Sequence, residues 1–228
     1  MLLTQSSVGR KLLMAATGLI LVLFVVVHLL GNSSIFIGPN GINAYAEHLH
    51  SLGPLVWVFR LIMLAVICIH IALGVQLTLE NQSARPKAYS VKENLKATFS
   101  SRTMIISGLV LLAFIIYHLL QFTVQLPGLT PMGAKVNLTE LHGNMVPNVF
   151  GMVVTTFHSL FVTLIYVVGM IFLFLHLGHG VQSFFQTLGL TNDKTFPGIG
   201  VFGKVVAFVL LLGYVSIPLL IIIGAVNG

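Results

Sequence analysis

Long apolar runs alternate with short polar stretches along this chain, and the runs predict its architecture. Runs of predominantly apolar residues occur at about 11–31, 55–79, 103–126, 152–180 and 203–226. A helix needs about 20 such residues to cross the roughly 30 Å of hydrocarbon in a bilayer. The pattern therefore predicts one all-α domain over residues 1–228, an integral membrane bundle of five transmembrane helices.

The stretches between the runs are rich in glycine, proline, asparagine and serine, which favour turns and loops. We expect ordinary loops at 31–54, 127–151 and 189–200. The stretch 80–102 is the most charged part of the chain, and we expect it to include a short surface helix. The first run is too long for a signal-peptide core and lacks a small-residue cleavage site, so it should remain as a span.

Composition agrees with lipid as the solvent, because 57% of the residues are hydrophobic and 7% are charged. The net charge of +6 comes from cations that flank the apolar runs, which indicates topology rather than a nucleic-acid partner. The single cysteine, Cys68, lies inside an apolar run. It can form no internal disulfide and offers no thiolate cluster for zinc or an iron–sulfur centre.

The cations also predict how the spans are oriented. One side of the predicted topology carries Arg10, Lys11, Arg85, Lys87, Lys92, Lys96, Arg102, Lys194 and Lys204. The other side carries only Arg60 and Lys135. By the positive-inside rule the first side is cytoplasmic, so the N-terminus is expected inside and the C-terminus outside. The fifth run has no ionisable residue beyond its first turn, so we expect it to cover the bundle rather than carry chemistry.

Four of the nine histidines lie deep in apolar sequence, one in each of the first four runs: His28, His70, His118 and His176. An ionisable side chain inside a span is costly and commonly functional. A neutral imidazole bonded to a neighbouring helix would explain any single one of them. Four histidines, one per helix, favour a shared ligand instead.

Depth in the bilayer sorts these histidines into two pairs. His28 and His118 lie about 24 Å and 22 Å from the inner starts of helices that run outward, at about 1.5 Å per residue. His70 and His176 each lie about nine residues before the inner ends of helices that run inward. We therefore expect one level pair near the outer side and one near the inner side.

An internal repeat supports the same pairing. The segment from Thr17 to two residues past His28 aligns with the segment from Ser107 to two residues past His118, with seven of fourteen positions identical. Likewise His70-Ile-Ala-Leu-Gly-Val-Gln matches His176-Leu-Gly-His-Gly-Val-Gln. The first two helices thus repeat as the next two, about an axis along the membrane normal.

Haem b suits such pairs best, because a neutral imidazole binds iron through Nε2 while a backbone carbonyl one turn back can hold its Nδ1–H. No Cys-x-x-Cys-His is present, which excludes covalent c-type attachment. Zinc would need three or four clustered ligands rather than two separate pairs. Glycines in the four helices either admit a flat macrocycle or allow close helix packing: Gly18, Gly74, Gly108, Gly169 and Gly180.

The other histidines give weaker signals. His179, three residues after His176, could bond a haem propionate or be the ligand itself, but only His176 matches His70 in the repeat. His158 is expected near the outer end of helix four, where an interfacial position would explain it. The remaining three lie in outer loops and are expected to be solvated: His48, His50 and His142.

With these residues identified, the chain resembles the b-type cytochrome subunit of succinate:quinone oxidoreductases and quinol:fumarate reductases, in its five-helix, two-haem form. The resemblance covers nearly the whole length. It rests on Thr17-Gly with Phe-x-x-x-His28-Leu, Asn43-Ala-Tyr-Ala-Glu47, Leu-Gly-Pro-Leu-Val-Trp57-Val-Phe-Arg60, Ser107-Gly with His118-Leu, and His176-Leu-Gly-His-Gly-Val-Gln-Ser183-Phe-Phe-Gln-Thr-Leu-Gly189.

The resemblance implies that His28 and His118 bind the outer, distal haem and that His70 and His176 bind the inner, proximal one. It also implies a complex in the bacterial cell membrane, with an FAD flavoprotein and an iron–sulfur subunit docked on the cytoplasmic face. Five-helix, two-haem members commonly use menaquinone. The chain has no flavin-binding fingerprint, so it would be part of an enzyme only within that complex.

The quinone site is less defined by sequence. Glu47, with Arg60 and nearby histidines, could exchange the protons of quinol chemistry near the distal haem. Alternatively, Glu47 is an ordinary loop carboxylate and Arg60 pairs with a propionate. A second possible site lies near Ser6, Ser7 and Arg10, beside the proximal haem.

Two other functions compete with this interpretation. The chain could be the cytochrome subunit of another quinone-linked complex, such as a formate dehydrogenase or a hydrogenase, and copurifying subunits would decide. It could also be a haem-free transporter or proton channel with a histidine relay, although its spans hold almost no Asp or Glu to partner the histidines.

Overall fold

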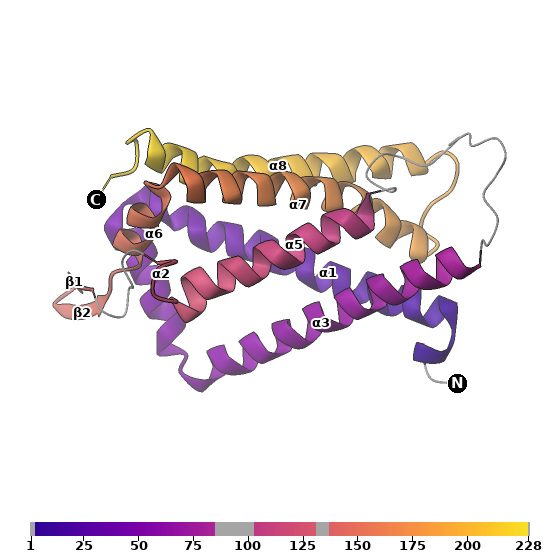
Figure 1. Cartoon of the computed structure of the whole chain (residues 1–228), viewed down its shortest axis with the longest axis horizontal. Coiled ribbons are helices and arrows are strands. Elements are labelled where there is room, and N and C mark those ends of the chain that lie inside the picture. Colours follow the sequence, from indigo (N-terminus) through magenta and orange to yellow (C-terminus); the bar gives the residue numbers. More distant parts are fainter. Residues whose placement is uncertain (1–2, 85–102, 131–136, 228) are drawn as a thin grey trace.

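The computed structural model describes residues 3–84, 103–130 and 137–227, and these residues form a helical bundle (Figure 1). Within the described residues, five helices are long and apolar enough to cross a membrane. At most 33% of the apolar window of any span is buried inside the protein. The predicted all-α, multi-pass membrane architecture is confirmed.

The spans are bounded by capping residues and prolines that fit helix termini. Ser6 accepts a hydrogen bond from the Gly9 amide at the start of the first span, and proline occupies the first turn of the second and fifth. The spans are α1 (Ser7–Asn32), α3 (Pro54–Ser83), α5 (Met104–His118) with its π-helical continuation η3 (Leu119–Val124), α7 (Leu160–Thr187) and α8 (Phe196–Ile222). A short 3-10 helix, η1 (Leu3–Gln5), precedes α1.

Helix α1 packs mainly on α3, and α5 packs mainly on α7. Helix α8 lies along α7 and also reaches α1, where the Tyr214 hydroxyl donates to the Val25 carbonyl oxygen at 2.7 Å. A Cβ on Gly213 would lie 2.6 Å from Leu29, so the glycine permits this approach. The two termini lie at opposite ends of the bundle (Figure 1), called below the N-terminal end and the C-terminal end.

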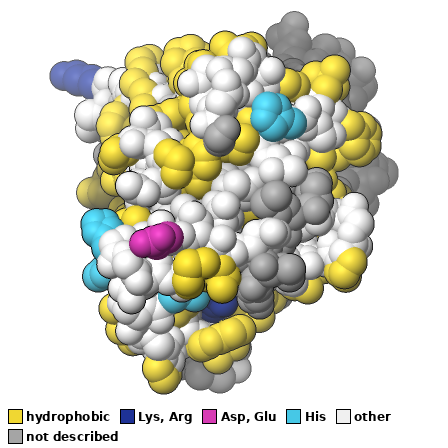
Figure 2. Space-filling model, turned by 90° about the vertical axis from the view of Figure 1, so that its left-hand side faces the viewer, with side chains coloured by type: hydrophobic (Ala, Val, Ile, Leu, Met, Phe, Trp, Pro, Cys, Tyr) yellow, Lys and Arg dark blue, Asp and Glu magenta, His cyan; other side chains and the backbone are white. Residues whose placement is uncertain are grey.

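Two stretches predicted as ordinary loops contain regular structure at the C-terminal end. Stretch 31–54 holds η2 (Ser33–Ile37) and α2 (Pro39–Ser51). Stretch 127–151 holds a hairpin of β1 (Leu138–Leu141) and β2 (Asn144–Pro147). None of these segments holds a long apolar run, so hydropathy did not reveal them. Figure 2 views this end, where histidine and acidic side chains lie among apolar ones.

The fourth predicted span is divided in the structure. A separate helix, α6 (Val149–Phe157), has His158 as its C-cap, and the Ser159 hydroxyl then caps α7. Helix α6 is buried against α2 and α8, and its Phe150 amide donates to the buried Asn43 side chain at 2.9 Å. Because α6 is as apolar as a span, hydropathy could not separate it from α7.

The stretches 80–102 and 189–200 also differ from simple loops. Helix α3 continues through Ser83, and the surface helix predicted further along falls in 85–102, outside the described residues. In the second stretch, α8 begins at Phe196 with Pro197 in its first turn, so the loop is shorter than predicted.

Candidate functional site

The four span histidines meet in the two predicted pairs. Near the C-terminal end, the rings of His28 (α1) and His118 (α5) lie next to each other, with centroids 5.9 Å apart and planes at 87°. Near the N-terminal end, the rings of His70 (α3) and His176 (α7) are 6.4 Å apart at 65°. Each pair therefore joins one helix of the first half of the repeat to one helix of the second half.

Hydroxyl groups on neighbouring helices hold both rings of the N-terminal-end pair. His70 Nδ1 lies 3.1 Å from Thr17 Oγ1, and His176 Nδ1 lies 3.1 Å from Ser107 Oγ. Each hydroxyl also lies within bonding distance of a backbone carbonyl in its own helix, to which it can only donate. The hydroxyl oxygen thus accepts from the Nδ1–H of the imidazole. The partner is a side chain of the neighbouring helix, rather than the carbonyl one turn back that sequence suggested.

A glycine next to each hydroxyl leaves room for the histidine ring. A Cβ on Gly18 would lie 3.3 Å from His70 Cε1, and a Cβ on Gly108 would lie 3.5 Å from His176 Cε1. Thr17-Gly and Ser107-Gly are therefore equivalent seats for the two rings. In the same way, Gly169 admits a ring from a neighbouring helix, because its Cβ would lie 2.6 Å from Phe114.

The C-terminal-end pair is surrounded by aromatic rings. Phe24 stacks on His28 with centroids 5.3 Å apart, and Phe114 stacks on His118 at 6.2 Å. Both phenylalanines lie four residues before their histidine, at equivalent positions of the repeat. His118 Nδ1 lies 3.1 Å from the Tyr166 hydroxyl, whereas no residue in the described part of the chain bonds to the His28 ring.

The ring separations of 5.9 and 6.4 Å are close to the separation that one metal ion between two imidazoles requires. Two metal–nitrogen bonds of about 2 Å, added to the distance from each ring centre to its nitrogen, place the centroids about 6.4 Å apart. Among the described residues no hydrogen bond joins the two rings of either pair, and the side-chain hydrogen bonds of His70, His176 and His118 use Nδ1 rather than Nε2. Among the described residues no three or more His, Cys, Asp or Glu side chains lie close enough together to hold a metal ion. The donors thus come as pairs, as in a haem held by two axial histidines.

The remaining histidines lie apart from the two pairs. The buried His179 Nδ1 has no partner in the described residues, but it is the His176 ring that faces His70. His158 is exposed where α6 ends. The others are exposed at the C-terminal end: His48 and His50 in the last turn of α2, and His142 in the hairpin turn.

The structure does not bring Glu47 and Arg60 into contact with a histidine pair. Glu47 is partly buried in α2 and forms no hydrogen bond or ion pair with another described residue. Arg60 is exposed on α3, with its guanidinium 4.9 Å above the centre of the Trp57 ring. Their proposed roles in quinone or propionate binding receive no direct support from these contacts.

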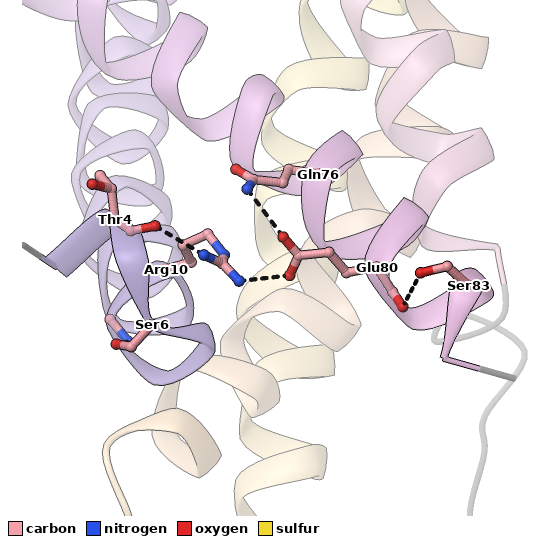
Figure 3. Close-up of polar contacts among 7 residues, drawn as sticks. Thr4, Ser6, Arg10, Gln76, Glu80 and Ser83 are labelled. Carbon is pink, nitrogen blue, oxygen red and sulfur yellow. Dashed lines mark hydrogen bonds and ion pairs between the residues drawn. The ribbon is translucent and has the colours of Figure 1, made fainter.

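The second predicted quinone region contains an ion pair between α1 and α3 (Figure 3). Arg10 Nη2 lies 2.9 Å from Glu80 Oε2, while Gln76 donates to the other carboxylate oxygen at 3.0 Å. The Nε of Arg10 is buried and has no partner in the described residues. Ser6 is used as the cap of α1.

Sequence reasoning missed the residues that hold the rings. For Thr17 and Ser107 a signal existed, since both precede a glycine at equivalent positions of the repeat. For Tyr166 and Gln121 there was none. Their counterparts, 106 and 90 positions earlier in the repeat, are Arg60 and Gly31, which share neither chemistry nor size with them.

Comparisons with protein-family models, with curated proteins and with solved structures find no match to this chain. The fold and the site together define a class of protein: a helical membrane bundle with two histidine pairs, one toward each end.

Proposed function

We propose that this chain is the membrane-anchor cytochrome b subunit of a succinate dehydrogenase or fumarate reductase. In that role it carries electrons between an iron–sulfur subunit and membrane quinone, with menaquinone expected. The proposal is supported mainly by the two histidine pairs inside the predicted spans, whose ring centroids are 5.9 and 6.4 Å apart. The choice of this complex over other quinone-linked ones rests on the sequence motifs.

Two haems b, if bound by these pairs, would supply two one-electron carriers stacked across the bilayer. His28 and His118 would hold one iron, and His70 and His176 the other. The hydroxyls of Thr17, Ser107 and Tyr166 accept the Nδ1–H groups, which keeps three of the four rings in the tautomer that has its Nε2 lone pair free. These hydroxyl acceptors thus prepare the three rings to bind a metal through Nε2.

The charge pattern supports an orientation with the N-terminal end in the cytoplasm. The pair of His70 and His176 would then be the inner one, nearest an iron–sulfur subunit and its FAD flavoprotein partner. The pair of His28 and His118 would lie near the outer side, below α2 with Glu47. Glu47 is proposed to exchange protons with quinol there, and Arg60 to bind a propionate or the quinone.

Purification of the complex in mild detergent, from cells supplied with haem precursors, tests this proposal. We expect two haems b per chain, two copurifying hydrophilic subunits, and reduction of both haems by succinate. A dithionite-reduced spectrum without a b-type α-band would refute haem binding and leave the proton-relay alternative. Copurification of formate dehydrogenase or hydrogenase subunits would instead move the chain to another quinone-linked complex.

Crosslinking tests the orientation separately. Crosslinks to the hydrophilic subunits are expected in 80–102 and 189–200, which the charge pattern places in the cytoplasm. Crosslinks confined to 31–54 and 127–151 would reverse the topology.

A further inference from the structure

A buried hydrogen-bond chain leads from His118 to the loop that follows α5. His118 Nδ1 lies 3.1 Å from the Tyr166 hydroxyl, which donates to Gln121 Oε1 at 2.7 Å. Gln121 in turn donates through Nε2 to the Leu129 carbonyl oxygen at 3.0 Å and to the Tyr117 hydroxyl at 3.2 Å. Tyr166 is 8% exposed and Gln121 is fully buried, so water does not compete for these contacts.

The direction of every bond in this chain follows from its far end. The Leu129 carbonyl oxygen can only accept, which places the amide nitrogen of Gln121 toward it and the amide oxygen toward Tyr166. Tyr166 must then donate its single proton to Gln121 and accept from His118. The ring of His118 therefore carries its proton on Nδ1 and offers Nε2 to a metal.

The backbone around Gln121 is shaped to keep this side chain in place. Directly after His118 the helix widens into the π-helical segment η3, a rare geometry that is frequent at functional sites. The buried Thr130 hydroxyl donates to the carbonyl oxygen of Gln121 and thereby closes the loop onto the helix. The Gln121 side chain is consequently fixed from both its backbone and its amide.

The hydrogen-bond chain from His118 through Tyr166 to Gln121 exists in only one half of the repeat. The repeat places Arg60 where the second half has Tyr166, and Gly31 where it has Gln121. Arg60 is exposed over Trp57, and the His28 ring has no hydrogen-bond partner among the described residues. His28 lies against His118 without such a hydrogen-bond chain of its own, so we infer that the pairing of the rings does not depend on it.

We propose that Tyr166 and Gln121 are positioning residues that set the electron-donating strength of His118, and through it the midpoint potential of the haem at the C-terminal end. The inference rests on the proposed haem binding. An acceptor on Nδ1–H makes the imidazole a more basic ligand, which favours the ferric over the ferrous state. The hydrogen-bond chain thus lowers the midpoint potential of the haem at the C-terminal end and leaves that of the other haem unaffected.

The test is a redox titration of Tyr166→Phe in the assembled complex, monitored at the α-bands. The phenylalanine keeps the ring contacts with Phe114 and Phe157 and removes only the acceptor. We expect two haems per chain, a positive shift in the midpoint potential of the C-terminal-end component, and no shift in the other. Gln121→Leu, which takes away the acceptor of Tyr166, should shift the same component in the same direction.

Tyr117→Phe is the matched control. It removes a hydroxyl from the same aromatic cluster but leaves His118, Tyr166 and Gln121 bonded as before, because Gln121 retains its carbonyl acceptor. Both potentials should stay at their wild-type values. A shift in Tyr117→Phe as large as in Tyr166→Phe would show that general packing, and not the chain, sets the potential.

The outcomes separate this inference from the proposed function. Wild-type protein without two b-type components would refute both. Two components in the wild type, with neither moved by Tyr166→Phe or Gln121→Leu, would refute the inference alone. If Tyr166→Phe loses the C-terminal-end haem, the titration of Gln121→Leu decides, since that variant keeps the tyrosine ring.

Discussion

The two histidine pairs differ in how their rings are held, although one repeat generates both. At the N-terminal end, Thr17 holds His70 and Ser107 holds His176, each at 3.1 Å and each beside a glycine. At the C-terminal end only His118 is held, by a tyrosine from the second half of the repeat. The N-terminal-end pair is therefore symmetric in its surroundings, and the C-terminal-end pair is not.

This difference shows which features a duplicated pair needs and which are additions. In each half of the repeat, a phenylalanine stacks on the first histidine, and a hydroxyl beside a glycine holds the ring of the second histidine. These features therefore serve what the two pairs have in common, which is two imidazole rings next to each other. The Tyr166–Gln121 chain and the adjacent Tyr214 ring, 6.3 Å from His28, lie outside the repeat. Additions of this kind give two otherwise equivalent sites different properties.

Removal of a histidine ring should have the largest effect on the two pairs. We expect His28→Leu and His118→Leu to lose the same haem, and His70→Leu and His176→Leu to lose the other, because each iron needs both axial donors. Haem content should fall from two to one per chain in all four variants. Low-temperature spectra and redox titration identify the component that survives.

The N-terminal-end pair should also be the more sensitive for assembly, since the proposed orientation puts it beside the docking face for the hydrophilic subunits. If His28→Leu and His70→Leu abolished one component while His118→Leu spared it, the pairing would be wrong. Loss of the N-terminal-end component in a His179→Leu variant, with His176→Leu retaining it, would move the ligand by three residues and leave the architecture intact.

The next largest effect is expected from filling a ring seat. Gly18→Val places a branched side chain where even a Cβ lies 3.3 Å from His70 Cε1, so the ring must move and the N-terminal-end haem should be lost or strongly reduced. Gly198→Val in α8 is the control, because a Cβ there meets nothing within 4 Å and this glycine is not one of those expected to admit a macrocycle. Haem content of the two variants, normalised to protein, is the measurement. Equal haem loss in both would mean that valine harms these helices by another route.

Sequence predicted the spans and the pairs for a physical reason: hydropathy and depth follow from composition and from a fixed rise per residue. It failed where the energetics are tertiary. Helix α6 and helix α2 are defined by burial against each other and by the Asn43 contact to Phe150, which no local pattern reveals. The partner of a histidine ring, such as Tyr166, depends equally on which residues of another helix share its level.

A smaller effect is expected when a hydroxyl of the symmetric pair is removed. Thr17→Val or Ser107→Ala leaves an Nδ1–H without its acceptor while the seat remains open. A hydrogen bond of about 1 kcal/mol corresponds to roughly 40 mV for a one-electron couple, so the N-terminal-end haem should shift positive by tens of millivolts. Thr78→Val, whose hydroxyl bonds only to the Gly74 carbonyl at 2.7 Å, should leave both potentials unchanged. A shift in the C-terminal-end component instead would contradict the assignment of these hydroxyls.

The smallest effect concerns the ends of the bundle rather than the pairs. At the N-terminal end Arg10 and Glu80 tie α1 to α3 at 2.9 Å, whereas Glu47 at the other end has no such partner among the described residues. Because the Glu80 side chain is 38% exposed, solvent screens the pair, and Glu80→Gln should cost up to about 1 kcal/mol of stability. Thermal unfolding in detergent should show a slightly lower midpoint for Glu80→Gln, with the gap to wild type closing at high salt.

Glu47→Gln makes the same change in an unpaired carboxylate, so it should leave the unfolding midpoint and both haems unaltered while slowing quinone turnover. Unchanged turnover would reduce Glu47 to a surface carboxylate, and a salt-independent loss of stability in Glu80→Gln would mean that shape, not charge, joins the two helices.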